Sequence, residues 1–506
     1  MAMIFTVNRG REIVVAGSEP GFDAIQCAID KAEMGDRIIV QRGDYLTGGL
    51  LIEKDGISLE FEPEARLTAR SIREEGYFKY KNCLATVRNC RGVSLIGEGA
   101  VLGMRKEEYP LAAGVAFESG SVDRGKNTLK IEDHGLVENY RYACMDTATK
   151  KPMAGLDGRG HCYVKIIDED EIRLSFDEDG NKPVRLMDGN YRLKPYVPGH
   201  RHVLKLEGAG AVLVRGLTLR DSGGDGIYVG RGCATEKVAG MPRRYCDDVT
   251  VERVNCFNNY RCAVSAVSVK GLMVDGCRLN DTRGGSPAAG FFAEPNRPDE
   301  LLQGIRVKNT VIRDNQYRGI HLNFDQLRGG NCADVDMEFE NIYIADSMMY
   351  HAIEVKKAYS DGPGGRVLFK DVLTNGNRAG LNVALKSKDA FGLEFENCIV
   401  DKVSPATEAP ITFYLGNETK VGGVEFRNCQ VIDHTERPAV AAYSAPGRSW
   451  HKVHGDIWVW NPARPVNYIE WGDNELCEAD LEVGWGRMEG YLKLVERITK
   501  LINPKK

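Results

Sequence analysis

Eight short segments of this chain repeat one pattern, an apolar run centred on Val or Phe that is followed by a polar or Gly position and a second short run. Successive centres are 37, 23, 33, 32, 30, 26 and 31 residues apart. A repeat in this range predicts a solenoid, in which each unit buries its apolar face against the next. Because the units lack a helical period, they predict an all-β fold, a single-stranded parallel β-helix with one coil per repeat. The centres are Val214, Val251, Val274, Val307, Phe339, Phe369, Phe395 and Phe426.

Length and composition agree with this fold. A chain of 506 residues exceeds a usual globular domain, but a solenoid grows in one dimension and needs no second core. The 56 glycines suit coils that turn sharply several times. The net charge of −5 argues against nucleic acid or an anionic membrane as a partner. It leaves room for a local basic cluster that binds an anionic substrate.

The repeat divides the chain into four predicted regions. Residues 1–115 form an N-terminal cap and the first coils, and residues 116–192 interrupt the repeat as an inserted β-rich module. Residues 193–445 form the main coils, and residues 446–506 form a C-terminal capping region. In that last region, residues 486–501 have the apolar spacing of an amphipathic helix, which we expect to cover the end of the solenoid.

The ends and the insertion resemble known modules. Residues 22–33 have helical spacing and are followed by a strand, a Gly-x-Tyr turn and another strand. This order resembles the N-terminal cap of the pectate-lyase-like superfamily, which implies a right-handed β-helix closed by a helix. The insertion contains DHGL and, later, GLDGRGHCYVKIIDEDEIRLS, and it resembles a small β-module of phage tail and appendage proteins. It is interpreted as a substrate-gripping lobe, an oligomer contact or a simple loop-out.

The second strand of each coil predicts a groove. When these strands are aligned by eye, the second and fourth positions are almost all apolar and are expected to face inward, because strand side chains alternate. The third and fifth positions then face outward. The third position reads Tyr228, Val264, Phe292, His321, Glu354, Asn382 and Thr412, and the fifth includes Glu294, Asn323 and Lys356. Asn296, Asp325 and Lys386 follow just beyond these strands. Polar groups clustered among aromatic rings favour a binding groove over a plain solvated face.

The amino-acid sequences of four segments in these coils show a second resemblance to known proteins. DSGGDGIYVG, NNYRCAVS, SPAAGFFAEPN and RGIHLNFD are similar to segments of uncharacterised bacterial right-handed parallel β-helix proteins that are grouped with carbohydrate-active enzymes. Those proteins have a segment close to AGIDxEPN. Here Phe292 stands where that motif has Asp, whereas Glu294 and Asn296 match it, and Asp225 matches the family's GDG. The departure implies an altered choice of substrate or a loss of activity.

The first functional hypothesis is hydrolysis of a glycosidic bond in an oligo- or polysaccharide. This reaction needs two carboxyl groups, one of them kept protonated. Glu294 and Asp325 are on adjacent coils with Cα atoms roughly 8 Å apart by strand geometry, which suits an inverting pair. Asp225, His321 and Glu354 are further catalytic candidates. The predicted substrate-binding residues are Tyr228, Arg261, Phe292, Asn296, Arg318, Asn323, Lys356 and Lys386.

The alternative reaction is β-elimination on a uronic-acid glycan. It needs a base such as Lys356, Lys386, Arg318, Arg261 or His321, and a cation to stabilise the enolate. Glu294, Asp325 and Glu354 provide oxygen ligands for Ca²⁺ in that case. No Asp-rich calcium loop is evident, so the hydrolase hypothesis includes no cofactor.

A third hypothesis is a non-catalytic sugar-binding or tailspike-like protein, which would be expected to trimerise. The pair His200 and His202 has metal-like spacing without a third ligand, so a structural role is favoured and no metal is predicted. Residues 1–17 lack an uninterrupted apolar core, no segment has the length to span a membrane, and the 14 cysteines contain no CxxC pair. These features predict a cytoplasmic protein with free thiols.

Overall fold

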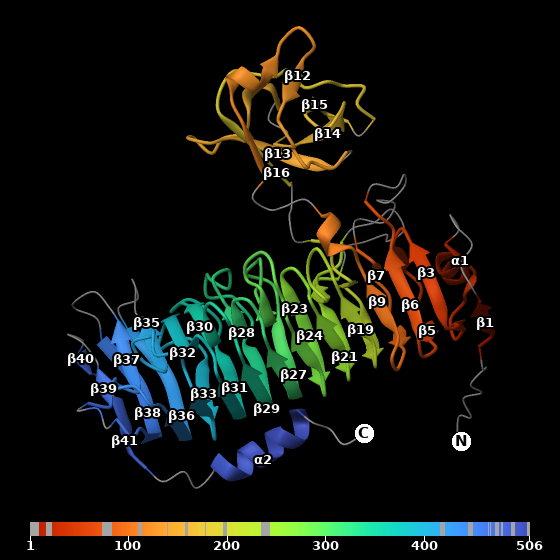
Figure 1. Ribbon diagram of the computed structural model, residues 1–506. Coiled ribbons are helices and arrows are strands. Elements are labelled where there is room, and N and C mark those ends of the chain that lie inside the picture. The colour runs from red at the N-terminus through yellow and green to blue at the C-terminus, as the bar shows by residue number, and fades with distance from the viewer. Residues whose placement is uncertain are drawn as a thin grey trace.

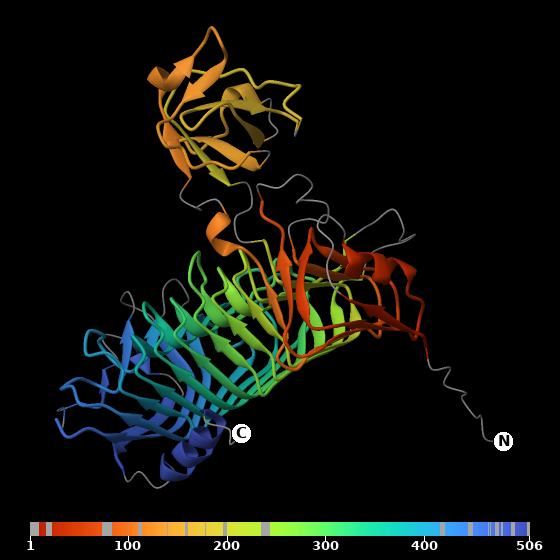
Figure 2. The ribbon, with the colours of Figure 1, turned by 45° about the vertical axis from the view of Figure 1, so that its right-hand side comes forward.

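The computed structural model describes most of the chain. The described residues are 10–16, 23–72, 83–109, 114–138, 140–156, 160–177, 179–195, 200–233, 243–414, 420–443, 449–463, 465, 467–470, 475–476, 479–486 and 491–502. Within them, the chain winds into a right-handed parallel β-helix, and a small β-module stands away from the solenoid near its N-terminal end (Figures 1 and 2). The predicted fold class is therefore confirmed.

The sheet that carries the candidate site contains 12 parallel strands among the described residues. In spatial order its strands follow the chain without a crossover, as one strand per coil requires. They are β4 (Leu50–Ile52), β7 (Ala85–Arg88), β17 (Leu204–Glu207), β20 (Ile227–Gly230), β23 (Cys262–Ala266), β26 (Ala289–Ala293), β28 (Arg318–Asn323), β30 (His351–Ala358), β32 (Ala379–Lys386), β35 (Ile411–Tyr414), β37 (Val440–Tyr443) and β39 (Ile469–Glu470).

The rest of each coil belongs to a sheet with 22 described strands, which turns around the other sides of the solenoid. These strands are β1 (Glu12–Val15), β2 (Arg37–Val40), β3 (Gly43–Thr47), β5 (Ser58–Phe61), β6 (Ala65–Ala69), β8 (Ser94–Ile96), β9 (Val101–Gly103), β18 (Gly210–Arg215), β19 (Thr218–Arg220), β21 (Cys246–Glu252), β22 (Asn255–Phe257), β24 (Val269–Asp275), β25 (Arg278–Asn280), β27 (Leu302–Arg313), β29 (Val335–Ala345), β31 (Gly365–Asn375), β33 (Gly392–Glu396), β34 (Ile399–Asp401), β36 (Lys420–Ile432), β38 (Ser449–Trp460), β40 (Glu475–Leu476) and β41 (Ala479–Trp485).

The repeat centres found in the sequence stack on one another. Strand pairing places all eight in one column, from Val214 opposite Val251 to Phe395 opposite Phe426. The four phenylalanines pack with ring centroids 4.7, 5.2 and 5.1 Å apart and planes 11° apart. Cys277, Cys398 and Cys429 are buried free thiols, as the sequence predicted.

Buried asparagines hold one corner of the solenoid together. The Asn315 side chain donates to the Leu279 carbonyl at 3.0 Å and accepts from the Thr282 backbone amide at 3.0 Å. Asn259 and Asn377 make the same pair of bonds to their own preceding coils. Each amide thus satisfies one donor and one acceptor that the turn would otherwise bury without a partner.

Glycine is required where a coil enters the site-bearing sheet. A Cβ atom at Gly290 would lie 2.3 Å from Ile312 Cγ2, and one at Gly319 would lie 2.3 Å from Ile344 Cγ2. Both contacts are too short for any side chain, so the coil closes only with hydrogen at these positions.

The two predicted helices are present. Helix α1 (Ala24–Lys31) has Asp23 as its N-cap and packs on β1, β2 and β4. Helix α2 (Tyr491–Ile502) packs through Leu494 and Ile498 on Leu373, Ile399 and Ile432. The expectation that this helix closes the end of the solenoid is wrong: it lies against the side of β27, β29 and β31, because its apolar stripe packs on apolar side chains of that face (Figure 1).

The inserted module is a separate antiparallel sheet of seven strands, which run from Val115 to Pro195. Arg201 lies between the rings of Tyr109 and Tyr140, 4.5 and 4.4 Å from their centroids, and so links the solenoid to the module. Three short 3₁₀ helices accompany these segments: Lys106–Glu108, Ser119–Ser121 and Ala154–Leu156. The strands are β10 (Val115–Phe117), β11 (Val122–Asp123), β12 (Thr128–Lys130), β13 (Arg141–Asp146), β14 (Cys162–Ile166), β15 (Glu171–Ser175) and β16 (Tyr191–Pro195).

Candidate active site

The outer face of the 12-stranded sheet carries one column of aligned side chains. Strand pairing gives the order Tyr228, Ser265, Phe292, His321, Glu354, Asn382 and Thr412. The predicted alignment was wrong in one row, where Ser265 and not Val264 occupies the column. All five residues of β23 are small and buried, so the sequence there has no inside–outside alternation that would fix the register.

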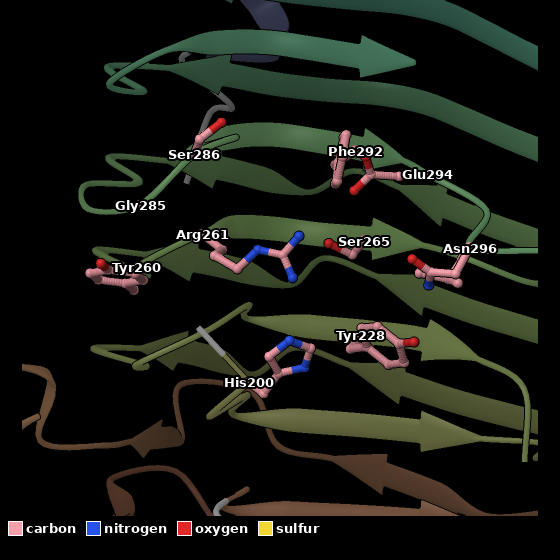
Figure 3. Close-up of a pocket in the computed structure, with 11 residues that line it drawn as sticks. His200, Tyr228, Tyr260, Arg261, Ser265, Gly285, Ser286, Phe292, Glu294 and Asn296 are labelled. Atoms are coloured by element: carbon pink, nitrogen blue, oxygen red, sulfur yellow. The ribbon is translucent and has the colours of Figure 1, made fainter. Parts of the chain in front are cut away.

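A cavity of about 350 Å³ opens on this face at strands β20, β23 and β26. Figure 3 shows the Phe292 ring and the Glu294 carboxylate on one strand, Arg261 and Ser265 on the next, and Tyr228 beyond them. The lining combines the aromatic rings of two tyrosines and a phenylalanine with an imidazole, a guanidinium, a carboxylate and several small polar groups. Its residues are His200, Tyr228, Tyr260, Arg261, Ser265, Val267, Gly285, Ser286, Phe292, Glu294 and Asn296.

Beneath the cavity lies a buried pair of titratable side chains, a carboxylate and a histidine whose pKa burial lowers. Asp225 and His202 are both 0% exposed, and His202 Nδ1 is 3.3 Å from Asp225 Oδ2. Burial raises the pKa of the Asp225 carboxyl, but the Arg261 guanidinium and His202 outweigh this effect and the pKa is lowered. The His202 ring stacks under Tyr228 with centroids 4.9 Å apart. Asp225, predicted to be catalytic, therefore lies behind the cavity wall and holds a negative charge near Arg261.

Glu294 is positioned from the neighbouring coil. The Asn323 side chain donates to Glu294 Oε1 at 2.8 Å, and Asn323 Oδ1 accepts from the Asp325 backbone amide at 3.3 Å. The predicted neighbours Glu294, Asn323 and Lys356 are thus brought together, since Asn323 also pairs with Lys356 across β28 and β30. Asn296 donates its backbone amide to the buried carboxylate of Glu300 at 2.6 Å.

Next to the cavity, Glu354 forms the centre of a nearly buried polar cluster. Its Oε2 atom lies 2.6 Å from Arg318 Nε, 3.1 Å from His321 Nε2 and 3.4 Å from Lys356 Nζ. Burial raises the pKa of Glu354, but the cations Arg318 and Lys356 lower it by more, so the pKa lies below its ordinary value and the group is ionised. Burial and the same two cations lower the pKa of His321 well below its ordinary value, so this imidazole is neutral at pH 7. The His321 ring also packs 4.9 Å from that of Phe292.

Asp325 lies on the same flank, 27% exposed, in a set of ion pairs. It contacts Arg328 at 2.8 Å, Lys357 Nζ at 3.4 Å and the Tyr359 hydroxyl at 3.3 Å. Burial raises the pKa of Asp325, and the hydrogen bond from Arg328 together with Lys357 more than offsets this, so the pKa is lowered.

Lys386, predicted to bind substrate, is 0% exposed. Its ammonium group donates to the backbone carbonyls of Gly422 at 2.8 Å and Ser387 at 3.2 Å. The side chain was predicted to point outward from an extended segment. That prediction is wrong, because Leu385, just before it, has a φ of 55° and turns the chain. The side chain is therefore directed into the protein and not toward the groove.

Several cavity residues were not selected from the sequence. Tyr260, Ser265, Gly285 and Ser286 line the cavity, and His200 lies in it instead of forming a metal pair. Tyr260 lies two residues before the first residue of β23, Cys262, a position that the strand alignment did not include. Among the described residues, no group of three or more His, Cys, Asp or Glu side chains is placed to hold a metal ion. None of the helices within the described ranges is long and apolar enough to cross a membrane.

Comparison with known proteins places the fold. No protein-family model and no curated protein matches the chain. Among solved structures, it is similar to a family 28 exopolygalacturonase from Yersinia enterocolitica, with 13% identity, a TM-score of 0.52, and coverage of 93% of this chain and 79% of that one. It is also similar to the catalytic unit of a thermostable GH87 α-1,3-glucanase from Streptomyces thermodiastaticus, with 12% identity, a TM-score of 0.50, and coverage of 94% and 69%. The chain therefore has a right-handed parallel β-helix fold, which it shares with these two structures.

Proposed function

We propose that this protein is a carbohydrate-active enzyme that hydrolyses glycosidic bonds in the cavity on its 12-stranded sheet. The observation that carries the proposal is the placement of the Glu294 carboxylate in a cavity lined by the rings of Tyr228 and Phe292. Aromatic rings bury the apolar faces of sugars, while polar groups fix the hydroxyls. Two neighbours in fold are named as hydrolases of glycans, which supports this reaction class, although fold by itself does not define function.

The chemistry needs an acid and a base on opposite sides of the bond. In the proposed mechanism Glu294 donates a proton to the leaving glycosidic oxygen. Asp325 accepts a proton from the water that attacks the anomeric carbon. Two observations support these roles: Arg328 and Lys357 keep Asp325 ionised, and Asn323 bonds both to Glu294 and to the backbone of Asp325.

A second candidate reaction, β-elimination on a uronic-acid glycan, has its own support. Burial lowers the pKa of Lys356 more than Glu354 raises it, so this lysine loses its proton more readily than an exposed one. A lysine of that kind beside the cationic Arg318 suits removal of a proton next to a carboxylate. The two reactions differ in product, since only elimination forms an unsaturated sugar.

One assay separates them. The protein is incubated with neutral and uronic-acid oligosaccharides, and reducing ends and unsaturated-uronate absorbance are followed together. For a hydrolase, we expect new reducing ends without absorbance, and a fall of about 100-fold or more in Glu294→Gln. The matched control is Glu338→Gln, which changes a carboxylate paired with Arg306 and Lys308 on the other sheet. Growth of absorbance would replace hydrolysis by elimination, and silence in both channels would favour a binding protein.

A further inference from the structure

The flank of the cavity toward the C-terminal end carries excess positive charge. It consists of strands β28 and β30 with the turn after β28, and we call it the cationic flank. Its charged groups are Arg318, Arg328, Lys356 and Lys357, with Glu354 and Asp325 as the carboxylates. Four cations meet two carboxylates, whereas the whole chain carries a net charge of −5. The excess is therefore local to this part of the groove.

Each of the two carboxylates of the cationic flank already lies close to two cations. Glu354 Oε2 lies within 3.4 Å of both Arg318 and Lys356, and Asp325 lies within 3.4 Å of both Arg328 and Lys357. His321 and His351 beside them are neutral and add no charge to the flank, because burial lowers the pKa of both. Arg318 and Lys356 are held at low exposure with only Glu354 between them, which is costly unless a ligand supplies a second anion. Arg328 and Lys357, in contrast, are solvated at 48% and 36% exposure. The Lys356 side chain, 23% exposed, remains accessible to such a ligand, while Arg318 is only 10% exposed.

The flank is well placed relative to the cavity. Glu294 follows β26, and Lys356 lies on β30, two strands further along the solenoid. Strands are about 4.8 Å apart, so the ammonium group lies about 10 Å from the candidate acid along the axis. A glycan that lies along the groove therefore brings a neighbouring sugar unit over the flank.

We propose that the cationic flank binds the carboxylate of a hexuronic acid unit next to the bond in the cavity, so that the protein selects acidic glycans. This inference rests on the proposed function and specifies its substrate class. The guanidinium and ammonium donors match a carboxylate, and a neutral sugar would leave their charge unbalanced.

The test is a binding measurement that needs no turnover. Calorimetric titration of Glu294→Gln uses a tetrasaccharide of hexuronic acid and its carboxyl-reduced neutral counterpart. We expect the acidic ligand to bind about tenfold more tightly or better, with an affinity that falls as NaCl is added. Adding Lys356→Met should remove most of this preference. Lys308→Met is the matched control, since Lys308 is 31% exposed in ion pairs on the other sheet, and it should keep the preference.

The outcomes separate the two proposals. Equal affinities for the two ligands, no binding of the acidic one, or an equal loss in Lys308→Met would each overturn the inference. Cleavage of a neutral glycan without any preference would leave the hydrolase in place and reject only the acidic substrate. A preference that depends on Lys356 without any cleavage would keep the site and reject the enzyme.

Discussion

Lys386 provides a direct test of the buried electrostatics of this solenoid. Its ammonium group is fully buried, bonds to two backbone carbonyls and lies 5.0 Å from the centroid of the Phe391 ring. Burial is the largest cause that lowers its pKa from 10.5 to about 7. Of the nearby charges, Asp389 raises the pKa and Lys452 lowers it. The unfolded chain, with an ordinary pKa, therefore binds one more proton than the folded protein between these two values.

The sign and size of the effect follow from this difference. Where the unfolded state binds more protons, stability rises with pH, by about 1.4 kcal/mol per pH unit for one group. Applied to Lys386, this predicts that the free energy of unfolding rises by about 2–3 kcal/mol between about pH 7.5 and 9.5. The contribution levels off below the folded-state pKa, where both states are protonated.

The perturbation is Lys386→Met, which keeps the length of the side chain and removes the titration. Urea unfolding followed by tryptophan fluorescence at several pH values measures the free energy of unfolding of both proteins. We expect the free energy of unfolding of the wild type to rise by about 2–3 kcal/mol relative to that of the variant over this pH range. Lys270→Met, an exposed position on β24, should keep the pH dependence of the wild type. Parallel pH curves for Lys386→Met and wild type would refute the reasoning.

Two further predictions concern the stack and the site. Phe369 is fully buried between two parallel rings, so Phe369→Ala should lower the free energy of unfolding by about 3–5 kcal/mol, whereas Tyr414→Ala, half exposed, should change it by less than about 0.5 kcal/mol. A thermal melt compares them, and equal shifts would contradict the stacked core. Lys357→Met should raise the pKa of Asp325 toward its ordinary value, because a cation that favours the carboxylate is lost. The acid limb of the pH–rate profile of cleavage should therefore move to higher pH, and an unchanged limb would exclude Asp325 as the base.

The sequence predicted the coils well because their spacing is a local property. The column from Val214 to Phe426 was aligned correctly, since a large apolar residue recurs at the same place in every unit. The same reasoning placed Phe292 beside His321 and His321 beside Glu354. It failed at β23, where Cys, Ala, Val and Ser are all small enough to be buried on either side.

The candidate site was only partly accessible to such reasoning. Glu294, Arg261 and Tyr228 were selected and do line the cavity; Tyr228 lies within β20, Arg261 directly precedes β23 and Glu294 directly follows β26. His200 and Ser286 lie on connections that the strand pattern does not constrain. Asp225 was chosen from its match to the GDG motif and Lys386 was assumed to face outward beyond its strand, and both are fully buried.

The sequence by itself determined the architecture: the parallel β-helix, the buried Val and Phe column, a β-rich insertion and the chain segments that form both helices. These follow from apolar spacing, which acts within one coil or between neighbours. Only the tertiary structure decided which polar side chains share an environment. Contacts between distant segments decide three features. Asp225 is ionised behind Arg261, Glu354 is shared by two cations, and helix α2 packs on the side of the solenoid. Burial and charge balance arise from such contacts, and no local pattern encodes them.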